Sequence, residues 1–190
     1  VPAAKRGRVV VLGGGVAGGN AALVAAALGA EVTVFDTDRD KLVMARALGA
    51  NVTGLYPHLS DVADAVRQAD IAIGAVLVTG ARAPHVITAE MVRTMQRGSV
   101  IVDISVDQGG CVETTKPTTY DAPTYVWEGV THFAVTNMPG AVPRTSSQAL
   151  SAAIAPYASR LAESGWRDDA GLARGINIDA GKVVHPALMS

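Results

Sequence analysis

The sequence predicts an α/β protein with a doubly wound parallel sheet of about six strands and a helical extension at its C-terminal end. Short β-branched runs alternate with alanine-rich stretches, which is the pattern of consecutive βαβ units. Several runs are apolar without alternation, as expected of strands that helices cover on both faces. The predicted strands are 8–12, 31–35, 51–55, 71–74, 99–103 and 131–135.

Four helices are predicted between these strands, at 16–28, 40–48, 60–68 and 88–95. Ser60 and Thr88 stand where N-caps belong, each with an acidic residue in the turn that follows. The connection 105–130 contains two adjacent glycines and two prolines and shows no helical period. Because long structureless connections inside a compact domain are usually functional or flexible, we expect this one to be functional.

The pattern changes after residue 135. A turn-rich stretch at 137–143 precedes a long helix predicted from about 146 to 162, with a kink at Pro156. The tail that follows is too small to form a core of its own. We therefore expect one domain at 1–143 and a C-terminal helix and tail at 144–190 that pack against something else.

Composition excludes several classes of function. The net charge of −1 gives no reason to expect nucleic acid or an anionic membrane as a partner, and no apolar run approaches the roughly 20 residues that cross a bilayer. The one cysteine rules out a disulfide within the chain and fits a reducing compartment. The four histidines are scattered without metal-ligand spacing, so no metal site is predicted.

A glycine pattern lies between the first predicted strand and the first predicted helix. Gly13, Gly15 and Gly18 form G-x-G-x-x-G, which is typical of a dinucleotide-binding turn. There the first glycine permits the bend, the second leaves room for a pyrophosphate, and the third lets the helix approach the strand. Val16 and Ala17 open the helix and offer N–H groups and a positive dipole to the phosphates. For the glycines alone, a simple βα turn is the alternative.

An acidic residue strengthens the dinucleotide interpretation. Asp36 ends the second predicted strand, 18 positions after Gly18, where a carboxylate accepts hydrogen bonds from the adenosine ribose. A 2′-phosphate would meet like charge there, which favours NAD over NADP. Arg39 lies close enough in sequence to leave NADP open, although we expect it to be solvated. The sequence therefore predicts a Rossmann-type NAD site.

Further candidates follow the other strands, because ligands bind beyond the carboxyl ends of an open parallel sheet. Ala75, Val76 and Leu77 are apolar and suit packing on the adenine or nicotinamide, with a continuation of the strand as an equal alternative. Asp107 can orient substrate or transfer a proton, or it can merely cap its loop. Asn137 offers a neutral donor and acceptor, or is a turn residue.

Four other polar or reactive residues are expected to lie outside the site. Asp103 lies within or at the end of a strand and is expected to be structural. His85 sits in a loop that can reach the cleft, but a place outside it is favoured. His132 is expected on the surface or in the core, and Cys111 is expected to be a buried or half-buried bystander rather than a reactive thiol.

Three segments together resemble the L-alanine dehydrogenase family: 74–84 (GAVLVTGARAP), 106–111 (VDQGGC) and 137–146 (NMPGAVPRTS). The resemblance extends over essentially the whole chain, and its last two motifs are specific. The alpha subunit of proton-translocating transhydrogenase is similar in the glycine loop and at 75–84 but lacks the last two motifs. Alanine dehydrogenase is therefore preferred.

The resemblance implies reversible oxidative deamination of L-alanine to pyruvate and ammonia, with hydride passing between the substrate Cα and NAD. It implies that Asp107 is the active-site aspartate and that Asn137 and Met138 lie in the loop facing the nicotinamide. It also implies a cytoplasmic homo-oligomer, commonly a hexamer, without nucleic-acid or membrane partners.

The family carries a substrate domain ahead of its NAD domain, with a catalytic histidine and with lysine and arginine that bind the pyruvate carboxylate. This chain begins where the NAD domain begins, and none of its histidines matches that residue. We therefore expect NAD binding with little or no turnover from this polypeptide alone, because a catalytic set acts as a unit. The alternatives are a stand-alone NAD-binding or sensing module and the NAD(H)-binding component of a transhydrogenase.

Overall fold

The computed structural model describes residues 3–78 and 83–189 and divides into two compact units. Unit 1 is Val1–Thr136 and unit 2 is Asn137–Ser190. Each unit is described by itself.

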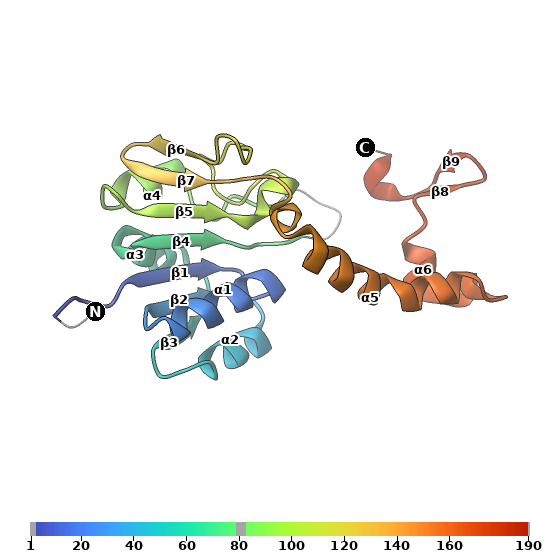
Figure 1. Cartoon of the computed structure of the whole chain (residues 1–190), viewed down its shortest axis with the longest axis horizontal. Coiled ribbons are helices and arrows are strands. Elements are labelled where there is room, and N and C mark those ends of the chain that lie inside the picture. The colour runs from blue at the N-terminus through green and yellow to red at the C-terminus, as the bar shows by residue number, and fades with distance from the viewer. Residues whose placement is uncertain (1–2, 79–82, 190) are drawn as a thin grey trace. The chain divides into compact units, whose positions relative to one another are not determined.

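Unit 1 is built on a seven-stranded sheet with the order β3-β2-β1-β4-β5-β7-β6 (Figure 1). All neighbouring strands are parallel except β6 and β7, so the predicted doubly wound parallel sheet is confirmed. The chain moves outward in opposite directions from β1 and β4, which places the switch point of the sheet between them. The strands are β1 (Arg8–Leu12), β2 (Glu31–Phe35), β3 (Val52–Leu55), β4 (Ile71–Gly74), β5 (Val100–Asp103), β6 (Thr124–Trp127) and β7 (Val130–Phe133).

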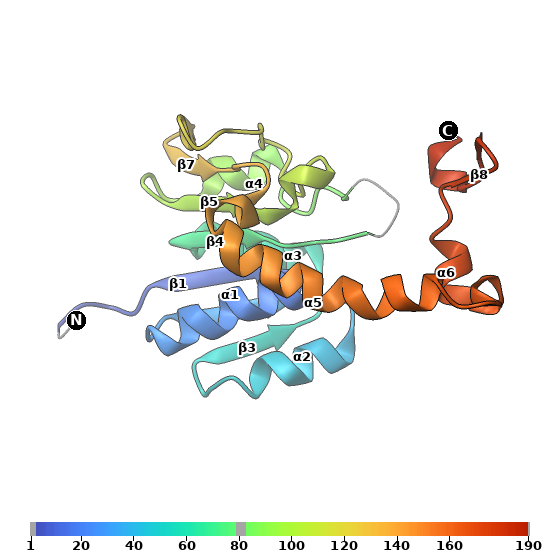
Figure 2. The ribbon, with the colours of Figure 1, turned by 45° about the vertical axis from the view of Figure 1, so that its right-hand side comes forward.

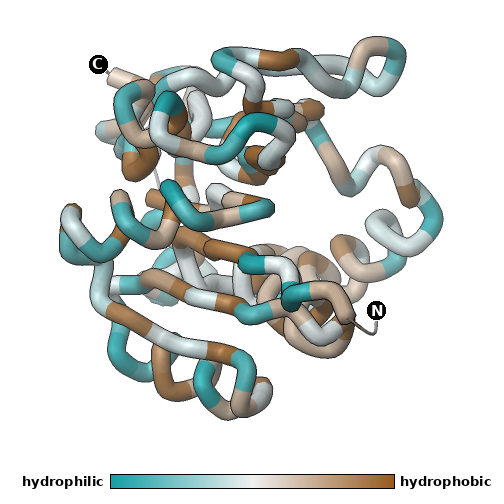
Figure 3. The backbone as a smooth tube through the Cα atoms, turned by 90° about the vertical axis from the view of Figure 1, so that its left-hand side faces the viewer, coloured by the Kyte–Doolittle hydropathy of each residue, from teal (hydrophilic) through white to brown (hydrophobic). Residues whose placement is uncertain are grey.

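Helices cover both faces of this sheet, as Figure 2 shows for α1 and α2 on the near face. The helices are α1 (Val16–Ala27), α2 (Arg39–Arg46), α3 (Leu59–Gln68) and α4 (Ala89–Thr94). Alternate residues of β1 belong to two different cores, because successive side chains of a strand point to opposite faces. Val9 and Val11 pack with residues of α1 and α2, whereas Val10 and Leu12 pack with residues of α3 and α4. The apolar strand segments, brown in Figure 3, accordingly lie at the centre of the unit.

The connection 105–130 is more ordered than the sequence predicted. It opens with a 3₁₀ helix at Ile104–Gln108 and contains β6, which pairs with β7 through a two-residue turn. Glu128 and Gly129 form that turn, both with positive φ. Such turns normally carry Asn-Gly or Asp-Gly, so Glu-Gly gave a weak hairpin signal. The strand itself alternates exposed and half-buried residues at the sheet edge, and the sequence analysis missed it.

The two predicted helix caps differ in outcome. Thr88 is an N-cap as predicted, since its Oγ1 accepts a hydrogen bond of 3.2 Å from the backbone N–H of Met91. The prediction for Ser60 is wrong, because α3 begins at Leu59 with His58 in the cap position and no side-chain cap. Ser60 therefore lies inside the first turn.

Unit 2 contains a long helix followed by short elements. A 3₁₀ helix at Met138–Ala141 leads into α5 (Pro143–Leu161), which begins three residues earlier than predicted and runs through Pro156. The short α6 (Ala170–Arg174) and the pair β8 (Ile178–Asp179) and β9 (Lys182–Val183) follow. None of residues 137–189 is buried. Across the described parts of both units, no helix is long and apolar enough to cross a membrane.

Candidate functional site

The glycine pattern forms the turn between β1 and α1, and its three glycines are needed for three different reasons. Gly13 has φ +100°, and a Cβ there would collide with the carbonyl of Ala75. A Cβ at Gly18 would collide with the carbonyl of Gly13, so this glycine lets the helix lie against the turn. A Cβ at Gly15 would meet nothing within 4 Å. Open space at Gly15 is what a bound pyrophosphate requires.

The start of α1 is equipped to bind an anion. Its N-cap residue, Gly15, has no side chain to cap the helix, and the first turn contains no acidic residue. Val16 and Ala17, the first two helical residues, are both exposed. The first N–H groups of a helix have no partner within the helix, so these amides and the positive end of the dipole are open to a phosphate.

Asp36, just beyond β2, is drawn to the glycine turn by hydrogen bonds. Its Oδ2 accepts from the N–H of Gly14 at 2.7 Å, and its Oδ1 accepts from the N–H of Asp38 at 2.8 Å. The side chain is only 9% exposed. A carboxylate oxygen has more than one lone pair, so each can still accept from a ribose hydroxyl. The structure therefore brings together the two features from which the NAD site was predicted.

Lys41, on the first turns of α2, is a site residue that the sequence analysis missed. Its Nζ lies 3.6 Å from Asp36 Oδ2, whereas Arg39, the cation that was considered, is exposed. The spacing could have revealed it, because Lys41 stands five residues after Asp36 in the βα connection of the second strand. The lysine side chain is 42% exposed, so the pair contributes little to stability.

The apolar segment after β4 lies beside the glycine turn. Ala75 donates its N–H to the carbonyl of Leu12 at 2.8 Å, while β4 itself ends at Gly74. Val76 is half-buried and Leu77 is 69% exposed. These residues therefore follow the strand instead of continuing it. Residues 79–82 of the same motif, including Thr79 and Gly80, lie outside the described residues.

Two aspartates with opposite surroundings follow β5. Asp103 is 0% exposed, which agrees with the expectation of a structural residue. Asp107 lies in the 3₁₀ helix Ile104–Gln108 and is exposed. Ser105 of the same helix donates its Oγ–H to the carbonyl of Val76 at 2.8 Å, which joins this helix to the segment after β4. Asp107 thus stands at the carboxyl edge of the sheet, the edge of the glycine turn.

Asn137 and Met138 belong to unit 2, so they are described only within it. Asn137 has φ +51° and ψ +52° and directly precedes the 3₁₀ helix that begins at Met138. This left-handed conformation is one that asparagine tolerates better than most residues. It fits the turn alternative and leaves a role toward a ligand as a prediction.

Two other reactive groups of unit 1, Cys111 and His132, are buried. Cys111 is fully buried, and burial raises the pKa of its thiol to about 12, so it is not a nucleophile at neutral pH. His132 is a core residue, hydrogen-bonded to Thr114 and to the carbonyl of Val130. Burial lowers the pKa of His132. Within residues 3–78 and 83–189 no cluster of His, Cys, Asp or Glu could hold a metal ion.

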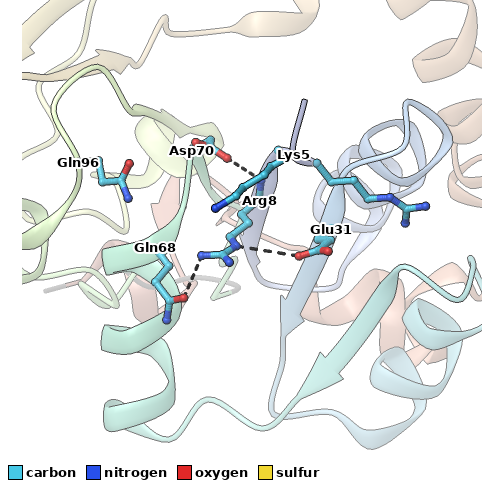
Figure 4. Close-up of a pocket in the computed structure, with 8 residues that line it drawn as sticks. Lys5, Arg8, Glu31, Gln68, Asp70 and Gln96 are labelled. Atoms are coloured by element: carbon cyan, nitrogen blue, oxygen red, sulfur yellow. Dashed lines mark hydrogen bonds and ion pairs between the residues drawn. The ribbon is translucent and has the colours of Figure 1, made fainter. Parts of the chain in front are cut away.

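A hollow of about 770 Å³ lies at the opposite edge of the sheet, where β1, β2 and β4 begin (Figure 4). The Arg8 side chain spans it, with Nη1 3.0 Å from Gln68 Oε1 and Nε 4.0 Å from Glu31 Oε2. The backbone N–H of Arg8 donates to Asp70 at 2.7 Å. Because ligands of doubly wound sheets bind at the carboxyl edge, this hollow is not the predicted cofactor site.

The sheet and the glycine turn with its carboxylate define a dinucleotide-binding domain of the doubly wound class. The chain belongs to the family described as alanine dehydrogenase/PNT, C-terminal domain, whose model matches residues 1–186. The comparisons confirm the resemblance to alanine dehydrogenase and identify the chain as the NAD-binding part of that family.

Individual relatives agree with the family. The alanine dehydrogenase of Halomonas elongata is 48% identical over 99% of this chain and 52% of its own length, and that of Geobacillus stearothermophilus is 47% identical over the same shares. A solved L-alanine dehydrogenase matches with a TM-score of 0.87 and 49% identity, over 100% of this chain and 54% of the other. A transhydrogenase structure from Sinorhizobium meliloti has a TM-score of 0.78 and 27% identity, over 95% and 50%. The chain thus spans about half the length of its curated relatives.

Proposed function

We propose that this chain holds the NAD(H) of an L-alanine dehydrogenase, which interconverts L-alanine with pyruvate and ammonia. The observation that carries the proposal is the hydrogen bond from Gly14 N–H to Asp36, which joins the predicted ribose carboxylate to the pyrophosphate turn. The relatives at 47–48% identity are alanine dehydrogenases, so neither a stand-alone sensing module nor a transhydrogenase component is favoured.

Each part of the site has a role in this proposal. The N–H groups of Val16 and Ala17, two exposed residues at the start of α1, bind the pyrophosphate, and Asp36 accepts from the adenosine ribose. Ala75, Val76 and Leu77 line the dinucleotide. When bound, the nicotinamide supplies the hydride acceptor.

Asp107 is the catalytic residue of the proposal and Asn137 and Met138 face the nicotinamide. An exposed carboxylate at the carboxyl edge of the sheet can orient the amino group of the substrate or accept a proton from it. Hydride transfer itself needs no protein group as a carrier, so the task of these residues is to orient substrate and ring.

The carboxylate of Asp36 also supports NAD over NADP. A 2′-phosphate would approach a carboxylate that is 9% exposed, where repulsion between like charges is poorly screened. Lys41 at 3.6 Å offsets part of this repulsion. We therefore propose a preference for NAD without absolute exclusion of NADP.

Turnover of alanine, in this proposal, needs residues beyond these 190. The curated relatives are about twice as long as the matched region. The segment 144–190 packs on the substrate domain in this scheme, which would cover its exposed apolar side chains. The same exposure supports a homo-oligomer, a hexamer by the family resemblance, and the free thiol of Cys111 supports a cytoplasmic location.

The test is a fluorescence titration of the 190-residue polypeptide with NADH and with NADPH. Asp36→Ala should weaken NADH binding about tenfold or more and bring the two affinities together, because it removes a charge-assisted acceptor and the repulsion at once. Asp64→Ala, which removes an exposed carboxylate from α3, is the matched control and should change neither affinity.

The outcomes separate the parts of the proposal. Absence of saturable NADH binding to the unaltered polypeptide would contradict the function, and an unchanged Asp36→Ala affinity would contradict only the ribose assignment. The unaltered polypeptide should form little or no NADH from alanine until the N-terminal half of a relative is added. Ordinary turnover without that half would show that the site is complete in this chain.

A further inference from the structure

Asp103, the last residue of β5, is a buried carboxylate surrounded by neutral donors. Its Oδ1 accepts from the N–H of Ser105 at 3.0 Å. Its Oδ2 accepts from the N–H groups of Cys111 at 3.0 Å and Val112 at 3.1 Å. The same oxygen accepts from Thr115 Oγ1 at 2.6 Å. A buried charge is costly unless hydrogen bonds compensate it, so this set of donors is what allows a carboxylate here.

The backbone around Asp103 is shaped to deliver these donors. Gly109 and Gly110 both have positive φ, +89° and +77°, which reverses the chain directly after the 3₁₀ helix Ile104–Gln108. A Cβ on Gly110 would lie 2.9 Å from Asp103 Oδ2, and one on Gly74 would lie 3.3 Å from Oδ1. Glycines at both places therefore let two backbone segments close around the carboxylate.

The segment held in this way is the one that carries Asp107. Asp103 binds the chain both before Asp107, at Ser105, and after it, at Cys111 and Val112. The Oγ of Ser105 then reaches the carbonyl of Val76. One buried side chain thus holds the chain on both sides of Asp107, and the 3₁₀ helix that carries Asp107 is joined to the segment after β4.

We propose that Asp103 is a positioning residue for the nicotinamide end of the site. It touches neither cofactor nor substrate in this scheme, and acts by holding 104–112 so that Asp107 and Val76 keep their relative places. The inference rests on the proposed function. A purely structural Asp103 would support binding of every part of the cofactor equally, whereas a positioning residue supports the nicotinamide part alone.

Two ligands separate these roles: NADH, and ADP-ribose, which lacks the nicotinamide. Asp103→Asn places an amide N–H₂ among donors and should raise the Kd of NADH about tenfold or more, because at least one hydrogen bond to a charge is lost. The Kd of ADP-ribose should change less than about twofold, since the turn at Gly13–Gly18 and Asp36 are untouched. Thr115→Val should produce a smaller loss of the same kind, and Thr115→Ser, which keeps the hydroxyl, should restore the NADH affinity.

Ser99→Ala is the matched control. Ser99 is buried, like Ser105, and its Oγ donates to the carbonyl of Ala69 at 3.0 Å. This bond joins β4 and β5 where the two strands begin, whereas the bond from Ser105 to Val76 joins them where they end. This variant should lose stability without changing either Kd. All titrations are made on the 190-residue polypeptide, well below the unfolding temperature of each variant.

The results have distinct meanings. Equal changes for NADH and ADP-ribose, or no change for either, would overturn the positioning role while leaving NAD binding intact. If Asp103→Asn does not fold, the comparison of Thr115→Val with Thr115→Ser decides by itself, and identical affinities of these two variants would overturn the inference. If the unaltered polypeptide binds neither ligand, the proposed function fails and the inference fails with it.

Discussion

Unit 1 has a core of its own, whereas the described residues of unit 2 form none. In unit 1 both faces of the sheet are covered, and Ile101 at the centre of β5 is 0% exposed. In unit 2 no residue from 137 to 189 is buried. Its longest helix, α5, carries an apolar row with the spacing of one helix face: Leu150, Ile154, Tyr157 and Leu161, each between 47% and 60% exposed. The comparison teaches that unit 1 buries an apolar core of its own, whereas the apolar row of α5 stays largely exposed.

The largest expected effect comes from the same substitution made once in each unit. Ile101→Ala removes buried methyl groups and leaves a cavity, so the free energy of unfolding should fall by about 2–5 kcal/mol. Ile154→Ala, at a position that is 51% exposed on a helix, should change it by less than about 0.5 kcal/mol. Urea unfolding of both variants, followed by circular dichroism, measures the two values.

Equal losses of unfolding free energy in Ile101→Ala and Ile154→Ala would contradict the difference between a unit with a core and a unit without one. A large effect of Ile154→Ala in the 190-residue polypeptide would mean that the α5 face is already covered, for example by a second copy of the chain. Repeating the measurement over a range of protein concentrations separates that case, because stability that depends on association rises with concentration.

The contrast between the units also shows which features the sequence could reveal. The strands at 8–12, 31–35 and 71–74 were predicted with the bounds that the structure has, because each is rich in β-branched and other apolar residues and is bounded by glycine or by charged residues. The strand β6 was missed because it is an edge strand with a Glu-Gly turn. Local patterns thus predicted buried elements well and a half-exposed element poorly.

The site was predictable to the extent that it follows from strand ends. Gly14 of the glycine turn and Asp36 meet because β1 and β2 are parallel neighbours, which the βαβ pattern implies. The donors of Asp103 could not be foreseen in this way. They reach it because Gly109 and Gly110 turn the chain back after the 3₁₀ helix. Two adjacent glycines indicate a turn, but not which residue the returning chain will contact.

A second prediction concerns pH and again applies to unit 1. His132 is 1% exposed, its Nδ1 is 3.1 Å from the carbonyl of Val130, and burial lowers its pKa. Below the ordinary histidine pKa of about 6.5 the unfolded chain therefore binds more protons than the folded one. The contribution of neutral, buried His132 to the free energy of unfolding is fully present above that pH, and stability falls as the pH drops below it. The slope from this one group is at most about 1.4 kcal/mol per pH unit.

The measurement is urea unfolding of the 190-residue polypeptide between pH 7.5 and pH 5. It is made on the unaltered protein and on two variants, and the transition of unit 1 is followed. His132→Gln keeps a donor and an acceptor without titrating, so its curve should be flatter. His185→Gln removes a histidine of unit 2 and should follow the unaltered protein. The neighbours Asp103 and Tyr125 are common to all three proteins and cancel in the comparison. Parallel curves for the unaltered protein and His132→Gln would show that His132 does not carry this pH dependence.

The smallest effect is expected for the ion pair between Arg167 and Asp179 in unit 2. The guanidinium donates to both carboxylate oxygens, at 3.2 and 2.9 Å, which lowers the pKa of Asp179 and raises the pKa of Arg167. Any stabilisation is present above the ordinary aspartate pKa of 3.8 and is lost as the pH falls through the lowered value. Because both side chains are exposed, solvent screens the pair, and Asp179→Asn should leave the main unfolding transition unchanged.

Calorimetry of Asp179→Asn at neutral pH, in low and high salt, tests this last expectation. Because all buried residues among the described ones lie in unit 1, the main transition should not respond to an exposed charge in unit 2. If Asp179→Asn lowers the transition temperature in low salt but not in high salt, the two units unfold together, since an ion pair within unit 2 then affects the core of unit 1 through cooperative unfolding. The two units would then differ in how their side chains are buried but would unfold as one. A separate low-temperature transition that alone responds to Asp179→Asn would instead give unit 2 a weak stability of its own.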